Sequence, residues 1–372
     1  MQSMVRRVLL TLVLFSFLTS LCAAAQEAPT PVFNAFSCPK TLTLCGERMP
    51  LETPDVYEML DREFTVTVCD HARVFMLLKR AARYFPFIEK ALRDAGVPDD
   101  LKYLAVAESS LIPYARSNSS AVGHWQFIPS TAQKKGLRKD HSIDERMALE
   151  RSTEAAILYL KELRELFGSW TLAMAAYNCG ENRMEKEIRE QKVADYYRLN
   201  LPMETERYIF RIAAIKIVME NPRRYGYFLP EDQFYKPLKF DTVTVNINSS
   251  IHITDLAQAI GSDFKVIKEL NPELLDYYLP VGRYSLKVPA GSGRSALAAL
   301  TRLNHGAPVT PPPSNTAAGP AKQSGQGVYV VQPGDTLIRI STVTGVPVER
   351  LKALNGIPDS HIEVGQKLKL TP

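Results

Sequence analysis

The sequence lacks the residue spacings that mark metal sites in proteins. No CxxC or HExxH motif occurs in its 372 residues, and the six histidines are scattered along the chain. Structural and catalytic zinc sites need several histidine or cysteine ligands at short, characteristic spacings. We therefore expect no metal and no cofactor.

A strong charge of either sign is also missing. The chain has 45 Lys and Arg residues against 40 Asp and Glu residues, a formal net charge of +5. A domain that binds nucleic acid usually carries a much more pronounced basic character. We therefore expect no nucleic-acid partner.

Long apolar runs are scarce, and the only one long enough to matter lies near the start of the chain. The segment "VLLTLVLFSFLTSLC" follows Arg6 and Arg7 and precedes a short alanine run. This order of basic, apolar and small residues predicts a signal peptide over residues 1–25. The alternatives are an uncleaved membrane anchor, for which the run is short, and a lipid on Cys22, which bulky Leu21 disfavours. We expect export to the periplasm or outer-membrane-associated envelope of a Gram-negative bacterium, with membrane association only if the signal is retained or lipidated.

Cysteine is sparse after the predicted signal peptide. Cys38, Cys45, Cys69 and Cys179 remain, and an exported protein with four cysteines can form two disulfides in three connectivities. The loop between Cys38 and Cys45 is the easiest to close. Four free thiols are the alternative interpretation.

The chain divides into regions of different texture. From Asp70 to about Glu220 the apolar spacing is helical, with Gly, Pro and Asn between the segments, which predicts an all-helical domain. After Pro230 the sequence becomes β-prone, and residues 243–289 align with 328–370 at a shift of 84 residues as two strand, helix, helix, strand units. We predict five regions: a signal peptide (1–25), a helical catalytic domain with an N-terminal extension (26–235), a degenerate first module (240–290), a flexible linker rich in Pro, Ser and Ala (291–326) and a second module (327–372).

Glu108 is the strongest candidate for chemistry. Leu101, Leu104, Ala105 and Glu108 fall at i, i+3, i+4 and i+7, so the carboxylate lies on the apolar stripe of a helix. Burial penalises the charged form and raises the pKa of such an acid, which makes it a proton donor near neutral pH. A buried glutamate paired with an arginine is the alternative interpretation. No second acid occurs between Glu108 and Ala132.

The residues that follow Glu108 suit sugar binding. Ser117 and Gln126 can hydrogen-bond hydroxyl and acetamido groups, and Trp125 offers an apolar face to a sugar ring. Trp125 and Phe127 are equally compatible with the hydrophobic core.

Several blocks resemble a known family. "ESSLIPYARSNSSAVGHWQFIPSTAQKKGL", "AAYNCG" and "LPMETERYIF" are similar to the signature blocks of the soluble lytic transglycosylase-like fold, in particular the membrane-bound lytic murein transglycosylase D group. The two repeats resemble LysM modules, through "GDTL" and the later "LN" of the second repeat. The resemblance implies a multidomain protein with an all-α, lysozyme-like catalytic domain followed by two small α+β LysM (βααβ) modules.

The resemblance also implies roles for individual residues. Glu108 matches the catalytic acid and Tyr208 the tyrosine that supports it, while the matched substrate-binding positions are Ser117, Gln126, Tyr177 and Asn178. Ser120 stands where the family usually has glycine, and Cys179 where it has a small residue such as alanine. For the second module the resemblance implies glycan binding through Gly334, Asp335, Thr336, Leu337 and Asn355.

The implied reaction needs one protein carboxyl group. Glu108 would protonate the oxygen between N-acetylmuramic acid (MurNAc) and N-acetylglucosamine (GlcNAc), and then take a proton from the C6 hydroxyl of MurNAc as a 1,6-anhydro ring closes. Two other functions remain open, a muramidase that uses water and a non-catalytic glycan-binding scaffold. We expect a monomer whose partner is the peptidoglycan strand.

Two further expectations bear on that choice. Other acids should have structural roles, and one that faced Glu108 across the cleft would favour hydrolysis; the acids considered are Asp144, Glu145, Glu204 and Glu206. The first module has "SIH" where the second has "GDT". We therefore expect it to bind glycan more weakly and to pack against the catalytic domain.

Overall fold

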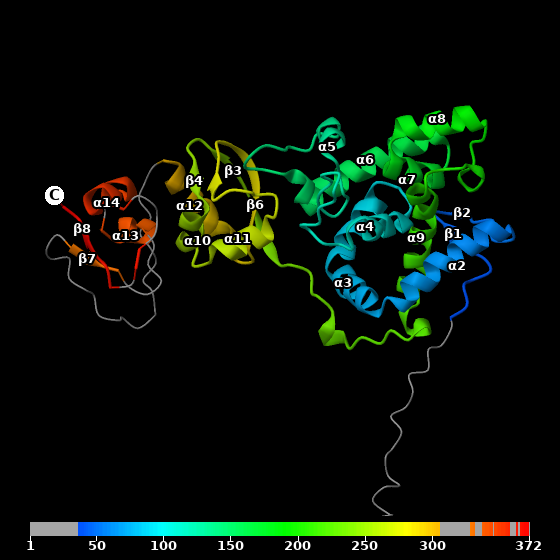
Figure 1. Cartoon of the computed structure of the whole chain (residues 1–372), viewed down its shortest axis with the longest axis horizontal. Coiled ribbons are helices and arrows are strands. Elements are labelled where there is room, and N and C mark those ends of the chain that lie inside the picture. Colours follow the sequence, from blue (N-terminus) through cyan, green and yellow to red (C-terminus); the bar gives the residue numbers. More distant parts are fainter. Residues whose placement is uncertain are drawn as a thin grey trace, which may run out of the picture. The chain divides into compact units, whose positions relative to one another are not determined.

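The structure is a computed structural model of the chain, and it describes residues 36–305, 328–331, 337–344, 346–357, 362–363 and 365–371. The predicted signal peptide, residues 306–326 of the predicted linker, and Gly334, Asp335 and Thr336 lie outside the described residues. The chain forms two compact units, Met1–Pro312 and Pro313–Pro372. Figure 1 shows the elements of each unit along the sequence.

The first part of the larger unit is almost entirely helical, as predicted. Its helices are α2 (Pro54–Cys69), α3 (His71–Asp94), α4 (Lys102–Ser109), α5 (Pro129–Lys134), α6 (Leu149–Phe167), α7 (Trp170–Cys179), α8 (Glu181–Gln191) and α9 (Met203–Glu220). A short hairpin of β1 (Thr43–Leu44) and β2 (Glu47–Arg48) precedes them. Among the described residues, no helix is long and apolar enough to cross a membrane.

Helix α9 forms the centre of this helical part. It packs against α2, α4 and α7, and its apolar residues from Tyr208 to Val218 are buried, as a helix inside a core requires. Helix α7 is held at its start by Glu47 of β2, whose carboxylate accepts hydrogen bonds from the backbone N–H groups of Trp170 (2.6 Å) and Thr171 (2.9 Å). An acid at a helix N-terminus is favourable because it satisfies free N–H groups and the helix dipole. These contacts fix α4, α7 and α9 relative to one another.

The first module belongs to the same compact unit. Its elements are β3 (Phe240–Ile247), β4 (Ile251–His252), α10 (Ile253–Ala259), α11 (Phe264–Leu270), β5 (Tyr278–Leu279), β6 (Gly282–Pro289) and α12 (Gly293–Asn304). Strands β3 and β6 pair antiparallel from Phe240 opposite Pro289 to Ile247 opposite Gly282. The predicted strand, helix, helix, strand order is confirmed, and the module packs against the helical part through a bridge between Ile143 and Leu274.

The predicted linker begins too early. Residues 293–304, which were assigned to it, form helix α12, which packs on β3 (Figure 1). Ala296, Ala299 and Leu300 are fully buried there, at a helical spacing of i, i+3 and i+4. The sequence analysis missed this apolar stripe because two of its three residues are alanine, whose small side chain is only weakly apolar. The remaining domain boundaries stay predictions.

The described residues of the second module follow the same strand, helix, helix, strand order as the main elements of the first. It contains β7 (Val328–Val330), α13 (Leu337–Thr344), α14 (Val348–Asn355) and β8 (Lys367–Lys369), and β7 pairs antiparallel with β8. Its core is formed by Val331, Leu337, Ile340, Leu351, Ile357 and Leu368.

The four cysteines that lie within the described residues are free thiols, so the predicted disulfides do not form in this structure. Cys38 and Cys45 pack separately into the helical core, and burial raises the pKa of the Cys38 thiol to about 12. Cys69 is exposed at the end of α2, and Cys179 lies partly buried at the end of α7. Buried thiols behave as small apolar side chains, which explains two of the four without any cross-link.

Candidate functional site

The helical part contains a cleft of about 910 Å³. It is lined by the end of α4, the segment of residues 115–127 (hereafter the cleft loop), the start of α8 and parts of α7 and α9. Six of the seven predicted catalytic and substrate-binding residues line it: Glu108, Ser117, Gln126, Tyr177, Asn178 and Tyr208. These positions are up to 100 residues apart in the chain, and the fold brings them together.

Glu108 lies in the last turn of α4 and is partly exposed to the cleft. Burial raises the pKa of its carboxyl group from 4.5 to about 7. The hydroxyl of Tyr208 donates a hydrogen bond to Oε1 of Glu108, and this bond opposes the increase by favouring the carboxylate. Glu108 can therefore hold a proton near neutral pH and also exist as a stabilised anion.

Tyr208 is a reliable hydrogen-bond donor at this position. It is 2% exposed on α9, and burial together with the neighbouring Glu108 raises its pKa well above the usual value. The phenol therefore keeps its proton across the physiological pH range. The arrangement supplies Glu108 with a fixed donor.

Arg211 is a cleft residue that the sequence interpretation missed. It lies on α9 three residues after Tyr208, and its positive charge lowers the pKa of Glu108. Its Nη1 lies 3.6 Å from Oε1 of Glu204, which also lines the cleft. The helical spacing of Glu204, Tyr208 and Arg211 was the available signal, because residues three and four apart share one side of a helix.

Tyr177 and Asn178 join the walls of the cleft. The hydroxyl of Tyr177 donates to the backbone oxygen of Trp125 in the cleft loop (2.7 Å). The side-chain oxygen of Asn178 accepts from the hydroxyl of Thr205 on α9 (3.0 Å). Both residues therefore position the cleft walls as well as lining them.

The cleft loop is held by side-chain to backbone hydrogen bonds. The amide nitrogen of Gln126 donates to the backbone oxygens of Ala115 (3.1 Å) and Gly123 (2.8 Å), which leaves its amide oxygen for a ligand. Oγ of Ser117 accepts from the N–H of Ala121 (3.1 Å), so its own hydroxyl proton remains to be donated. The side chain of Ser117 is exposed in the cleft.

The prediction that Trp125 offers its face to a sugar is wrong. Trp125 is 0% exposed, and its indole N–H donates to Oγ1 of Thr153 on α6 (2.9 Å). Phe127 is 2% exposed and also packs in the core. The large apolar surface of the indole and a buried partner for its N–H together favour the interior. The cleft loop is thus anchored by its aromatic side chains, and its polar side chains line the cleft.

A second loop, residues 138–147 (the bridging loop), holds the cleft loop through hydrogen bonds to its backbone. Arg146 is 2% exposed, and its guanidinium group makes a two-pronged contact with the carboxylate of Asp144 (2.8 and 2.7 Å). It also donates to the backbone oxygens of Ser120 (2.8 Å) and Phe127 (2.9 Å). A Cβ at Gly123 would lie 2.0 Å from the backbone oxygen of Arg146, so the two loops are in direct contact.

The four acids expected to be structural differ in their positions. Asp144 pairs with Arg146, and Glu145 accepts from the N–H of Arg138 (2.7 Å), which agrees with structural roles. Of these four acids, Glu204 alone lines the cleft, and its side chain is 71% exposed. Glu181, which the sequence interpretation did not consider, lines it too. A hydrogen bond from Tyr159 (2.6 Å) lowers the pKa of Glu181, so this acid is ionised at neutral pH.

In the second module, two predicted glycan-binding residues have structural roles. Leu337 is 3% exposed and belongs to the module's core. Asn355 donates to the backbone oxygens of Leu351 (2.8 Å) and Lys369 (2.9 Å) and accepts from the N–H of Lys369 (2.6 Å). Asn271 makes the corresponding bonds in the first module, to Ile267 and Lys287. The "LN" shared by the repeats therefore ties a helix to a strand.

Comparison with known proteins agrees with this geometry. The family described as Transglycosylase SLT domain matches residues 85–200, and the family described as LysM domain matches residues 329–371. Over these ranges the chain is similar to an SLT transglycosylase domain followed by a LysM domain, and it spans less than two thirds of the length of the first relative described below. The predicted resemblance and fold class are thereby confirmed.

Individual proteins match parts of the chain. "Membrane-bound lytic murein transglycosylase D" of Escherichia coli is 30% identical over 307 residues, which cover 78% of this chain and 64% of that protein. "Uncharacterized lipoprotein YgeR" of Escherichia coli is 64% identical over 44 residues, which cover 12% of this chain and 18% of that protein. A solved structure of an inactive mutant of the lytic transglycosylase Slt from Pseudomonas aeruginosa aligns with 17% identity over 41% of this chain and 26% of that chain. Its TM-score of 0.30 is too low to support an argument.

Proposed function

We propose that this protein is a lytic transglycosylase, which cleaves the MurNAc-β-1,4-GlcNAc bond of peptidoglycan and forms 1,6-anhydro-MurNAc products. The observation that carries the proposal is the environment of Glu108. Its carboxyl group faces a large cleft, its pKa is raised to about 7, and Tyr208 donates a hydrogen bond to it. One group with these properties can give a proton and take one back within a single reaction.

The first step needs the protonated form of Glu108. Because burial holds the pKa near 7, a substantial fraction of the carboxyl groups is protonated at neutral pH. The proton passes to the glycosidic oxygen, the bond from that oxygen to C1 of MurNAc breaks, and the GlcNAc side leaves as an alcohol. As the negative charge develops on Glu108, the hydrogen bond from Tyr208 and the charge of Arg211 stabilise it.

The second step uses the anion that the first step leaves. The Glu108 carboxylate takes the proton of the C6 hydroxyl of the same MurNAc, whose oxygen bonds to C1 and closes the anhydro ring. Glu108 thus regains the proton that it gave in the first step and returns to its starting state. The nucleophile is part of the substrate, and such an intramolecular attack benefits from proximity. No protein nucleophile is therefore needed.

The other cleft residues fit substrate binding. The free proton of the Ser117 hydroxyl and the amide oxygen of Gln126 can bind hydroxyl and acetamido groups. We propose that the LysM domain holds the enzyme on the same polymer, and that the chain is exported to the periplasm or outer-membrane-associated envelope. The match to a membrane-bound lytic murein transglycosylase supports these proposals.

One observation favours a second candidate, a muramidase that uses water. Glu204 shares the cleft with Glu108, as a general base for water would have to. Its exposure and its contact with Arg211 instead suit a role in holding Arg211. We therefore expect Glu204→Gln to retain most activity.

Mass spectrometry of products from purified sacculi tests the proposal. Wild-type protein should release muropeptides lighter by one water than hydrolysis products. Glu108→Gln should lower the rate by about a thousandfold, because the amide cannot transfer the proton. Ordinary reducing ends that vanish in Glu204→Gln would establish the muramidase instead, and full activity of Glu108→Gln would exclude both.

A further inference from the structure

We infer that the first module acts as a brace for the cleft loop, and that the catalytic cleft is incomplete without it. The inference rests on the proposed function, and it assigns to residues 240–304 a role in turnover that is separate from anchoring on glycan. Three observations carry it. The bridging loop contacts the module, the same loop contacts the cleft loop, and hydrogen bonds within the bridging loop connect these two contacts.

The tip of the bridging loop is part of the module. Ile143 is 3% exposed and packs in the module's hydrophobic core. The N–H of Asp144 donates to the backbone oxygen of Glu273 (2.9 Å), and the N–H of Leu275 donates to that of Ser142 (2.7 Å). Lys287 of β6 also pairs with Glu150 of α6. The module is thus joined to the helical part by an apolar plug, two backbone hydrogen bonds and an ion pair.

The base of the same loop holds the cleft loop. Arg146, three residues after Ile143, donates to the backbone oxygens of Ser120 and Phe127. These two carbonyls lie next to the segments that carry the substrate-binding candidates Ser117 and Gln126. Arg146 is buried and is not among the residues that line the cleft, so it is a positioning residue.

Between tip and base the bridging loop is cross-bonded. Oδ1 of Asp140 accepts from the N–H groups of Ser142 and Ile143 (both 2.8 Å). The N–H of Arg138 donates to Glu145 (2.7 Å), and Arg138 in turn accepts the N–H of Glu145 through its backbone oxygen (2.9 Å). A loop bonded in this way moves as one piece, so a shift of Ile143 displaces Arg146.

The cleft loop depends on such support because its backbone is strained. Ser120 and Gln126 have φ angles of 61° and 48°, which residues other than glycine seldom adopt. Strained backbone at a functional site persists only where surrounding contacts hold it. Without the module at Ile143, the loop would relax and misplace Ser117 and Gln126. The substrate would then bind more weakly.

The test compares two isoleucines of one hydrophobic core in the full-length protein. Ile143→Ala removes the plug of the bridging loop, whereas Ile253→Ala, at a residue that is 0% exposed within the module, leaves the bridging loop intact. Both are assayed on a short soluble glycan, at a temperature where circular dichroism shows them folded. Ile143→Ala should raise KM and lower kcat/KM by about tenfold, while Ile253→Ala should stay within about twofold of wild type.

A measurement of KM distinguishes a displaced cleft loop from a smaller fraction of folded protein. An unfolded fraction lowers the apparent kcat and leaves KM unchanged, so only a displaced loop raises KM. Amide hydrogen exchange gives a second readout: Ala121 and Gly123 should exchange faster in Ile143→Ala and not in Ile253→Ala. Unchanged KM and unchanged exchange in Ile143→Ala would overturn the inference.

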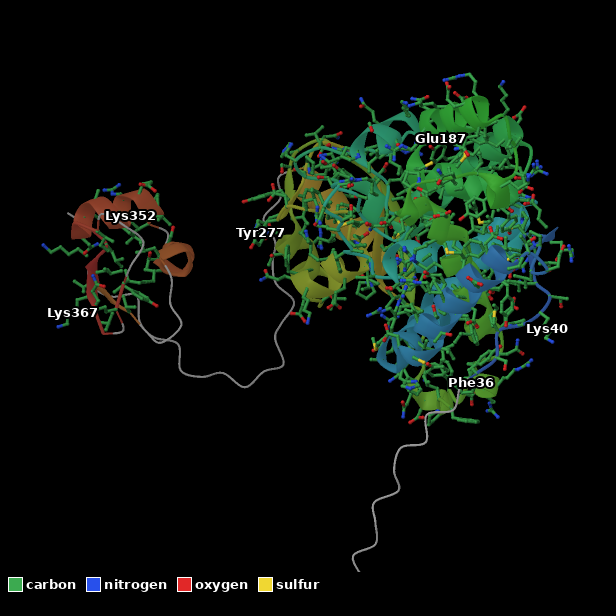
Figure 2. All side chains as sticks on the ribbon, turned by 45° about the vertical axis from the view of Figure 1, so that its right-hand side comes forward. Phe36, Lys40, Glu187, Tyr277, Lys352 and Lys367 are labelled. Carbon is green, nitrogen blue, oxygen red and sulfur yellow. The ribbon has the colours of Figure 1, made fainter. Side chains whose placement is uncertain are left out.

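A surface variant of the first module serves as a second control. Tyr277 lies on the first module (Figure 2), outside the contacts between the module and the bridging loop, and it is 61% exposed. Tyr277→Ala should leave KM on short glycan unchanged. If Ile143→Ala weakens only retention on sacculi, the module is an anchor and the brace is wrong. A wild-type protein that forms no anhydro products would refute the proposed function, whereas the exchange experiment would still decide the brace.

Discussion

At the residue scale, the proton affinity of Glu108 is set by burial and by an opposing hydrogen bond from Tyr208. Burial raises the pKa of this acid, and the bond from Tyr208 lowers it. Tyr208→Phe removes the lowering contribution while keeping the ring in the core. The pKa of Glu108 should therefore increase further above 7.

This change predicts a shift in the pH profile. A proton donor must be protonated, so kcat/KM of the wild type should fall as the pH rises through about 7. In Tyr208→Phe that decline should move to higher pH by about one unit, with a lower maximum because the anion loses a donor. Tyr196→Phe is a suitable control, because Tyr196 donates to backbone oxygens of α9 and not to Glu108. A profile that stays in place would contradict the assigned role of Tyr208.

Ser120 is a second position where a single residue should measurably lower the stability of the fold. It stands where the resembling family usually has glycine, and its φ of 61° lies in the left-handed region. Ser120→Gly should stabilise the protein by about 0.5–1 kcal/mol, since glycine adopts this conformation without steric cost. Thermal unfolding measures the change. Gly123→Ala is the opposite case and should destabilise strongly, because its Cβ would meet the backbone of Arg146.

At the element scale, helix α12 extends the first module beyond its repeat unit. Leu300 is 0% exposed and belongs to the module's core, and its helix packs against β3 and α10. Leu300→Ala should destabilise the module by about 2–5 kcal/mol, through lost burial and the cavity that remains. Leu297→Ala, at a residue of the same helix that is 47% exposed, should have little effect. Hydrogen exchange of β3 amides in both variants measures the difference, and equal exchange would place α12 outside the module.

At the scale of the whole molecule, we expect catalysis and retention on the cell wall to separate. A chain that ends at His305 keeps Asn304, whose side chain bonds the backbone of Asn246 and Asn248, and loses the LysM domain. It should be retained on insoluble sacculi at least about tenfold less, because a tethered binding module raises the local concentration of enzyme on its polymer. Turnover of short soluble glycan should stay near that of the wild type. Equal losses in both assays would contradict the anchor proposal.

The sequence was most informative where one pattern decides one local structure. The spacing of Leu101, Leu104, Ala105 and Glu108 placed the acid on the apolar side of a helix, and the repeats predicted the order of elements in both modules. Local patterns could not decide between core and cleft for Trp125, because an indole suits both. They also left out Arg211 and Glu181, whose charges look like ordinary surface charges until the fold places them at the cleft.

The sequence by itself determined the helical class of the first part of the larger unit, the acid at the end of α4 and the repeated modules, because these follow from periodicity and spacing along one stretch of chain. Only the tertiary structure decided which groups surround that acid. Tyr208, Arg211 and the buried Asp144–Arg146 pair act on the cleft from distant segments, and burial sets the pKa of Glu108. The physical reason is that desolvation and hydrogen bonding depend on neighbours in space, and no local pattern specifies those neighbours.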